Sequence, residues 1–244
     1  MKNRTHWLLK GQFLWLAIAL AAVFGFRVSL LPWRSAIMMV AAAVSGLVLT
    51  GFFSLLVLFM LLRTGQRGGG KDCLLSVALS LPALIGVLLL GVQGAKAPPI
   101  NDITTDTDNP PVFRAAQKLR LPGDNSIDYP GKTVADRQRQ SYPDIKSFET
   151  PLLPTEAFAQ SLATAEKLRW RVIGQDREQG LIEAVDQTLI FGFTDDIIIR
   201  IIPTGNGSRI DLRSASRAGI SDLGVNAERI RAFRRTFNSI QAKE

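Results

Sequence analysis

The clearest candidate for a binding site is a loop near the C-terminus, in which arginine and serine side chains gather before a predicted helix. The segment Arg213–Arg217 contains two arginines and two serines, and it precedes Ser221, which we expect to cap the helix. A helix N-terminus presents unpaired backbone N–H groups and attracts negative charge, so this loop could receive an anion. Asp222 offers an alternative, because its own carboxylate could satisfy the same groups, and the sequence favours neither interpretation.

A belt of arginines and acids is expected on the uncovered face of the predicted sheet, because its members alternate along neighbouring strands. The belt consists of Glu183, Asp196, Arg200, Arg209, Asp211 and Arg213. Guanidinium groups bind carboxylates and phosphates with two parallel hydrogen bonds, so the belt could bind such a group. Cross-strand ion pairing on a solvated face is the alternative that we favour. Together the loop and the belt give the candidate ligand-binding residues Arg200, Arg213, Ser214, Ser216, Arg217, Ser221, Asp222 and Asn226.

Three other polar motifs are weaker candidates. Asp195 and Asp196 are neighbours on a predicted strand and should point to opposite faces, which argues against a joint acid–base or metal site. The acidic stretch Asp102–Asp108 lacks the glycine and the closing glutamate of a calcium loop, so we expect turns and caps there. Gly205–Gly207 has no lysine and no following helix, which indicates a hairpin turn.

The positions of histidine and cysteine limit the possible chemistry. The chain has one of each, His6 and Cys73, and both precede residue 98. The C-terminal part therefore has no Ser-His-Asp or Cys-His nucleophile, no disulfide and no ordinary zinc site. We expect no metal and no cofactor, and an enzyme here would depend on carboxylate, serine, lysine, tyrosine or arginine groups.

Basic residues are unevenly distributed. Residues 1–97 contain nine Lys/Arg and one acid, whereas residues 98–244 contain twenty of each. The net charge of +8 therefore belongs to the apolar N-terminal part. Because the C-terminal part is neutral, it has no net field to attract phosphate backbones, and nucleic acid is not an expected partner.

The N-terminal part predicts three membrane spans at about residues 11–31, 35–62 and 73–95. Ser35–Leu62 and Cys73–Ala95 carry no charge, and both exceed the roughly 20 residues that cross a bilayer. Gly11–Phe26 is shorter, so the first span must accommodate Arg27 near its end. A cleaved signal sequence is the alternative for this segment, and an uncleaved span is favoured.

The Lys and Arg residues of the short connections predict the orientation. Lys2, Arg4 and Lys10 precede the first span, and three more basic residues separate the second span from the third, namely Arg63, Arg67 and Lys71. Positive charge concentrates on the cytoplasmic side of membrane proteins. We therefore expect a cytoplasmic N-terminus and a C-terminal part outside the plasma membrane.

The C-terminal part divides into an arm at 98–150 and a domain at 151–244. The arm is rich in Pro, Asp and Gly but carries regularly spaced apolar residues, which favours an extended segment lying along the domain. Apolar periodicity in the domain predicts a helix at Thr155–Leu168, capped by Thr155, then four antiparallel strands and a last helix. On that helix Arg229 is expected to face solvent. The expected fold is three transmembrane helices followed by a two-layer α+β domain.

Several of these segments resemble the family called domain of unknown function 1499. The resemblance rests on Phe193–Arg200, Gly207–Ser214 and Ser216–Arg231, and on the earlier motifs Asn101–Asp106 and Pro110–Phe113. It covers most of Ile100–Phe237 and leaves the three spans outside. The resemblance implies a bacterial-type envelope protein, which places the C-terminal part in the periplasm, and it implies no established activity.

The leading functional hypothesis is a domain anchored in the inner membrane that binds an anionic small molecule or an envelope protein through the loop and the sheet face. An envelope hydrolase or lyase that uses carboxylates and arginines is the second hypothesis, and it would need a pocket containing a perturbed carboxyl group. A subunit of a larger membrane complex is the third. Apart from the bilayer, the sequence identifies no partner.

Overall fold

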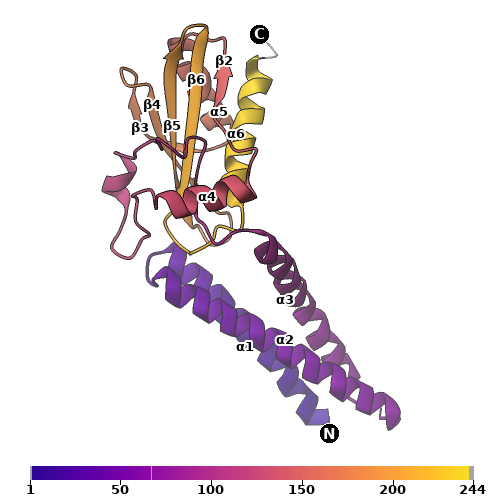
Figure 1. Cartoon of the computed structure of the whole chain (residues 1–244). Helices are drawn as coiled ribbons and strands as arrows, with labels where there is room; N and C mark the ends of the chain where they lie inside the picture. The colour runs from indigo at the N-terminus through magenta and orange to yellow at the C-terminus, as the bar shows by residue number, and fades with distance from the viewer. Residues whose placement is uncertain (1, 67, 242–244) are drawn as a thin grey trace. The chain divides into compact units, whose positions relative to one another are not determined.

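The structure, a computed structural model, describes residues 2–66 and 68–241, so Arg67, one of the orientation residues, lies outside the described part. The chain forms two compact units, at Met1–Gln93 and Gly94–Glu244 (Figure 1). We describe each unit by itself.

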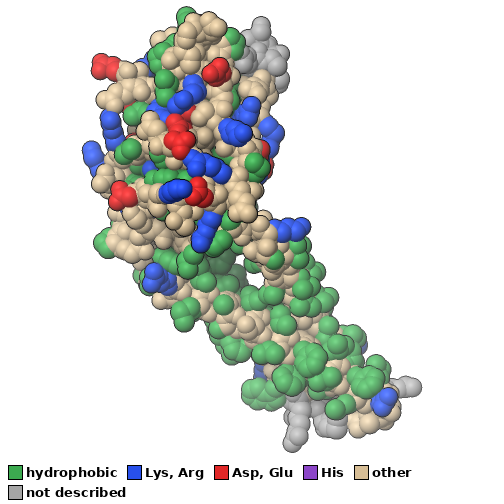
Figure 2. Space-filling model, viewed as in Figure 1, with side chains coloured by type: hydrophobic (Ala, Val, Ile, Leu, Met, Phe, Trp, Pro, Cys, Tyr) green, Lys and Arg blue, Asp and Glu red, His purple; other side chains and the backbone are tan. Residues whose placement is uncertain are grey.

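The first unit consists of helices α1 (Lys2–Arg27) and α2 (Trp33–Arg63) and most of α3 (Gly70–Lys96). All three are long and apolar enough to cross a membrane, with candidate spans at Thr5–Arg27, Trp33–Arg63 and Gly70–Lys96. The first span begins earlier than expected and ends at Arg27. Hydrophobic side chains cover much of the visible surface of these helices (Figure 2), as a lipid environment requires.

Small and polar residues fill the contacts between these helices. Gln12 is completely buried, and its Nε2 donates hydrogen bonds to the carbonyl oxygens of Leu47 and Ser76 at 3.2 and 2.8 Å. The hydroxyl groups of Ser54 and Ser76 lie 2.6 Å apart. Interhelical hydrogen bonds of this kind join helices where hydrophobic surroundings provide no driving force for association.

The second unit has the expected α+β architecture, built on a six-stranded antiparallel sheet. Its order is β1-β6-β5-β4-β3, and β2 also pairs with β6. The strands are β1 (Asp102–Thr104), β2 (Phe148–Thr150), β3 (Arg171–Asp176), β4 (Leu181–Gln187), β5 (Thr194–Thr204) and β6 (Gly207–Ser216). The helices are the short 3-10 helix η1 (Ala116–Leu119), α4 (Lys132–Ser141), α5 (Pro154–Lys167) and α6 (Val225–Gln241).

Helices α5 and α6 cover one face of the sheet. Isoleucine and leucine side chains of β5 and β6 pack there against Phe158, Phe233 and Phe237. Phe233 also stacks on Trp170 with ring centroids 5.7 Å apart. Because alternate residues of a strand point to opposite faces, the isoleucine-rich strands place one apolar set under the helices and leave charged side chains on the other face.

The arm covers that other face, which the sequence analysis wrongly expected to be uncovered. Phe113 and Ala116 of the arm pack on Ile198 and Ala215 of the sheet. The arm also supplies β1 and β2, which add two strands to the four expected ones. The arm is therefore a structural part of the domain and not only an extended segment.

Two predicted helix caps are wrong. Helix α5 begins at Pro154, and the backbone N–H of Leu153 donates to the carboxylate of Glu156 at 3.0 Å, so Thr155 lies inside the helix. Helix α6 begins at Val225, four residues beyond the expected cap at Ser221. The turn Gly205-Asn206 joins β5 to β6 as a hairpin, as expected.

Candidate functional site

Arg213 lies in β6 and is almost completely buried between the sheet and the arm. Its Nε and Nη2 donate hydrogen bonds to the carboxylate of Asp102 at 2.9 and 2.7 Å. Its remaining N–H groups reach the carbonyl oxygens of Pro111 and Ile127. Burial raises the pKa of Asp102, and the hydrogen bonds from Arg213 oppose this shift. These internal groups use the hydrogen-bonding capacity of the guanidinium, so the geometry favours a structural role for Arg213.

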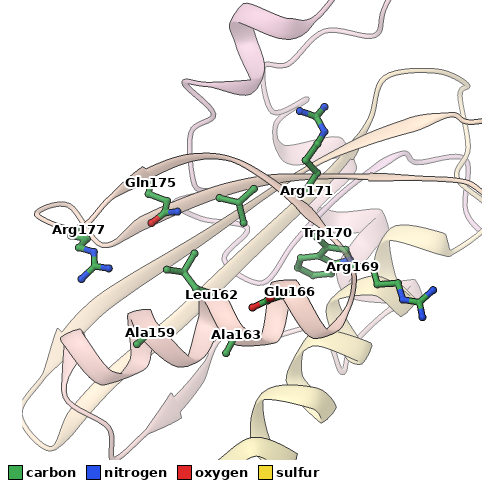
Figure 3. Close-up of a pocket in the computed structure, with 10 residues that line it drawn as sticks. Ala159, Leu162, Ala163, Glu166, Arg169, Trp170, Arg171, Gln175 and Arg177 are labelled. Carbon is green, nitrogen blue, oxygen red and sulfur yellow. The ribbon is translucent and has the colours of Figure 1, made fainter.

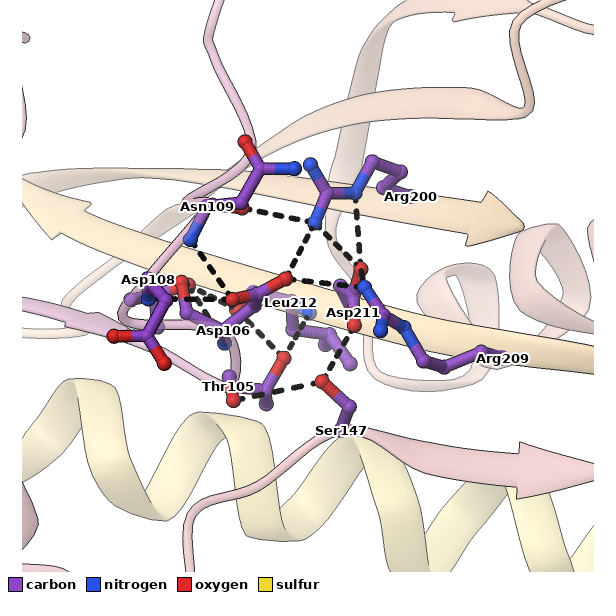
Figure 4. A network of polar contacts seen from close by, with 10 residues as sticks. Thr105, Asp106, Asp108, Asn109, Ser147, Arg200, Arg209, Asp211 and Leu212 are labelled. Carbon is purple, nitrogen blue, oxygen red and sulfur yellow. Dashed lines mark hydrogen bonds and ion pairs between the residues drawn. The ribbon is translucent and has the colours of Figure 1, made fainter.

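Arg200 belongs to a second cluster beneath the arm (Figure 4). Its guanidinium donates to Asp211 at 2.9 and 2.6 Å and to Asp106 at 3.0 Å. Arg209 also pairs with both carboxylates. Asp106 in addition accepts the backbone N–H groups of Asp108 and Asn109, which is the turn role expected for this stretch. The belt is thus an internal layer of ion pairs that attaches the arm to the sheet.

Arg217 and Arg120 share the carboxylate of Asp196. Arg217 approaches within 2.6 Å and Arg120 within 2.9 Å, and the side chain of Asp196 has no exposed surface. Asp195 lies on the opposite face of β5, where it pairs with Arg229 at 2.7 Å. The two adjacent carboxylates therefore form no joint site, as strand alternation predicts.

The serines of the predicted site lie in a separate network on the helical side of the sheet. The hydroxyl group of Ser214 donates to Asn226 at 2.7 Å, and the amide of Asn226 donates to the hydroxyl oxygen of Ser216 at 2.9 Å. Arg229 contributes N–H groups to Ser214 and Asn226. Arg229 is only 6% exposed, so the expectation that it faces solvent is wrong. Arg229 points inward, where it pairs with Asp195.

Asp222 satisfies the N-terminus of α6. Its carboxylate accepts the backbone N–H groups of Gly224 at 2.9 Å and Asn226 at 2.7 Å. Burial raises the pKa of Asp222, although these hydrogen bonds oppose the shift. The hydroxyl group of Ser221 donates to the carbonyl oxygen of Pro98 at 3.1 Å. Of the two interpretations that the sequence left open, the geometry therefore matches the one in which the protein's own carboxylate satisfies these groups.

The eight predicted site residues therefore do not converge on one cavity. Ser214, Ser216 and Asn226 lie together, while each arginine has its own acidic partner. Glu183, the remaining belt residue, accepts three backbone N–H groups from Arg114–Ala116 and so caps η1. Within residues 2–66 and 68–241, no His, Cys, Asp and Glu side chains form a group that could hold a metal ion.

An open groove that the sequence analysis did not identify lies between α5 and β3 (Figure 3). Its volume is about 790 Å³, and its apolar lining includes Leu162, Trp170 and Val172. Three arginines stand around it, namely Arg169 after α5, Arg171 on β3 and Arg177 in the β3–β4 turn. Figure 3 shows their guanidinium groups directed away from one another, at different sides of the groove.

These arginines differ from those of the belt in their partners. Among the described residues, no carboxylate lies within ion-pair distance of Arg169, Arg171 or Arg177. Arg177 contacts the ring of Phe158, 5.5 Å from its centroid. Strand β3 is also the edge of the sheet, and its register shifts between Val172 and Gly174. The sequence did contain a signal for this groove, because Arg171 lies in a predicted strand and Arg169 and Arg177 flank it.

A smaller groove of about 270 Å³ lies between residues 144–148 and α6. Four basic residues line it, namely Lys146, Arg231, Arg234 and Arg235. Two of these have acidic partners, because Arg231 pairs with Asp144 and Arg235 with Glu228, each at 2.6 Å. The hydrogen bonds from Arg231 lower the pKa of Asp144. This groove therefore has fewer uncompensated charges than the larger one.

Comparison with known proteins supports the resemblance seen in the sequence. The family model described as "Protein of unknown function (DUF1499)" matches residues 102–237, which is more than half of the chain. The match begins at β1 and ends within α6, so it includes the arm as well as the sheet. No curated protein matches the sequence.

Proposed function

This chain belongs to the family called domain of unknown function 1499. We propose that it is a membrane-anchored domain that binds an acidic segment of a protein partner. The observation that carries the proposal is the groove between α5 and β3, whose three arginines have no carboxylate partner among the described residues. Glu166 also lines the groove, but the three arginines outnumber it, and an excess of cations around a partly apolar groove favours an anionic occupant.

The spacing of these arginines favours an extended ligand over a single phosphate. A phosphate is held best when guanidinium groups converge on it, whereas Arg169, Arg171 and Arg177 point in different directions (Figure 3). An edge strand offers backbone N–H and C=O groups to an added extended segment. A peptide with several acidic residues matches both features, and this choice deepens the original hypothesis of an anionic ligand or a protein partner.

The location that we propose is the periplasmic side of the inner membrane. The basic residues at the start of α1 and at the adjacent ends of α2 and α3 support a cytoplasmic N-terminus. With three spans, the second unit then lies on the other side of the membrane. The envelope context implied by the family resemblance supports the same location.

The enzymatic alternative has less support from the site. A hydrolase or lyase would need a carboxyl group of shifted pKa in the pocket. Burial raises the pKa values of Asp102, which is enclosed within the second unit, and of Asp222, which is partly buried, but neither lines the groove. Binding therefore fits the groove better than catalysis.

The proposal can be tested with the full chain in nanodiscs of neutral phosphatidylcholine, using fluorescent oligoglutamate as the probe and oligolysine as its opposite-charge control. We expect oligoglutamate to bind and the triple variant Arg169→Ala/Arg171→Ala/Arg177→Ala to lose that binding. Arg235→Ala removes an exposed arginine elsewhere and should bind as the wild type does. Unchanged binding by the triple variant would refute the groove as the site.

The predicted loop site can be tested in the same assay through Arg217→Ala. Because Arg217 pairs with the buried Asp196, we expect this variant to lower the unfolding temperature. Loss of binding with an unchanged unfolding temperature would instead support a ligand-binding role for the loop.

A further inference from the structure

A group of exposed apolar side chains lies at one end of the sheet in the second unit. We call them the apolar tips, and they are Leu121, Leu189, Ile190 and Ile220. Leu189 is 92% exposed and Ile220 is 81% exposed. Isolated exposed apolar residues are common in proteins, but several of them at one end of a domain indicate an interaction surface.

The strand register places the tips together. Strand β4 ends at Gln187, which pairs with Thr194 at the start of β5, so the loop with Leu189 and Ile190 extends beyond this edge. The last residues of β6 pair with the first of β5, as Ser216 does with Asp195, so the loop with Ile220 leaves the same end. Leu121 belongs to the arm segment next to Asn125, whose amide donates to the carbonyl oxygens of Ser216 and Gly219.

The loop that carries Leu189 and Ile190 is closed and ordered. The backbone N–H of Thr188 donates to the carbonyl oxygen of Phe193 at 2.9 Å, and the N–H of Gly192 donates back to Thr188 at 2.9 Å. The rings of Phe191 and Phe193 stack with centroids 5.1 Å apart. The turn thus has a fixed shape, with the two aliphatic residues at its outer side.

The opposite end of the sheet differs in composition. The β3–β4 turn consists of Arg177–Gly180 and the β5–β6 turn of Gly205-Asn206, and neither contains an apolar side chain. Figure 1 shows the β5–β6 turn at the end of the sheet opposite to the loop that leads into α6. The β2–α5 connection at this end carries one exposed apolar side chain, Leu153, against four at the end of the tips, and this contrast indicates that the two ends have different surroundings.

Chain connectivity identifies those surroundings. The chain enters the sheet at β1, where Asp102 pairs with Ala215, so it enters at the end that carries the tips. Only five residues separate Asp102 from the end of α3 at Lys96. The six residue steps between them span at most about 20 Å when extended. If α3 spans a membrane, the start of β1 therefore lies within about 20 Å of the end of that span.

We infer that the apolar tips insert into the interface of the lipid bilayer and hold the domain against the membrane from which it emerges. Aliphatic side chains are stable at the boundary between lipid headgroups and acyl chains. The inference rests on the membrane insertion of α1–α3, and it is independent of the proposed acidic ligand.

The experiment uses the full chain in phosphatidylcholine vesicles, with one added cysteine that carries an environment-sensitive fluorophore. Leu189→Cys and Ile220→Cys report on the tips, and Asn206→Cys at the opposite turn is the matched control. The native Cys73 is buried, and wild-type protein treated with the label measures its background. Two quenchers are compared, a lipid with a nitroxide near its headgroup and aqueous iodide.

We expect the lipid quencher to reduce the fluorescence at Leu189→Cys and Ile220→Cys several-fold more than at Asn206→Cys, and iodide to show the reverse order. If iodide quenches the labels at the tips as strongly as the control label, the inference is overturned. Tip labels shielded from both quenchers would also overturn it, because protein and not lipid would then cover them. Vesicle flotation tests the membrane insertion of α1–α3 separately. Protein that does not float with the vesicles would refute that insertion.

Discussion

At the residue scale, the main feature of the second unit is the pairing of nearly every buried arginine with a buried acid. Arg213 pairs with Asp102 across elements that are far apart in sequence, and Arg229 pairs with Asp195 in the same way. A buried pair contributes little net stability, but the loss of one partner leaves a buried charge without compensation. These pairs therefore determine how the arm and α6 attach to the sheet.

We predict that Arg229→Ala strongly destabilises the second unit. The substitution leaves the carboxylate of Asp195, only 6% exposed, without its cation, and breaking such a buried pair typically costs about 3–5 kcal/mol. The control is Arg235→Ala, whose exposed pair with Glu228 should contribute at most about 1 kcal/mol. Chemical denaturation of both variants measures the difference. Equal free energies of unfolding for the two variants would contradict the assigned role.

The pair of Asp144 with Arg231 predicts a pH dependence. Hydrogen bonds from Arg231 lower the pKa of Asp144 below its ordinary value of 3.8, so the folded protein binds this proton less tightly than the unfolded chain does. The pair therefore stabilises the fold above the unfolded pKa, and its contribution disappears as the pH falls through the lower folded pKa. Because Asp144 is half exposed, we expect at most about 1 kcal/mol.

Acid titration of Asp144→Asn beside the wild type checks this sign. The free energies of unfolding should differ at neutral pH and converge in acid. A difference that grows as the pH falls would show that the pair does not act through the ionised carboxylate.

At the element scale, local periodicity in the sequence predicted the strands and helices well, but it did not predict which elements and side chains pair with one another. The strands of the meander and both long helices of the second unit were predicted because alternation and helical spacing are local signals. The charged belt was also predicted, since Arg200, Asp211 and Arg213 alternate with apolar residues. Its burial was not predictable, because the covering arm begins about 100 residues before β6 and no periodic pattern connects them. Arg229 was misplaced for the same reason: its partner Asp195 lies on another element.

Close packing between α1 and α2 gives a prediction for the first unit. A Cβ added at Gly46 would lie 2.2 Å from the indole ring of Trp15, whereas one added at Gly86 would meet nothing within 4 Å. We expect Gly46→Ala to destabilise the helices by about 1–3 kcal/mol, because overpacking forces them to move. Gly86→Ala should be neutral or stabilising, since alanine favours helix by about 1 kcal/mol over glycine.

Thermal unfolding of both variants in detergent micelles measures this difference. If Gly46→Ala were as stable as Gly86→Ala, the contact between Gly46 and Trp15 would not determine how the two helices pack.

At the scale of the whole molecule, the two units differ in the character of their surfaces. The exposed hydrophobic residues of α1–α3 fit a lipid environment, whereas the second unit has its own apolar core and carries charged groups on its visible surface (Figure 2). The family match covers residues 102–237, within the second unit. The family match thus leaves the three candidate spans outside, and the proposed binding groove between α5 and β3 lies within the matched region.

The orientation of the anchor is the last prediction. Three basic residues lie in the first nine residues of α1, and three lie at or between the adjacent ends of α2 and α3, while the connection from α1 to α2 has only Arg27 and Arg34 near it. Because positively charged connections stay in the cytoplasm, alkaline phosphatase fused after Glu244 should be active in a bacterial host, and the same enzyme fused after Gln66 should be inactive. Fusion after Leu30, in the connection expected outside, should be active and serves as an internal control. The reverse pattern would place the groove in the cytoplasm, and an envelope protein could then no longer be its partner.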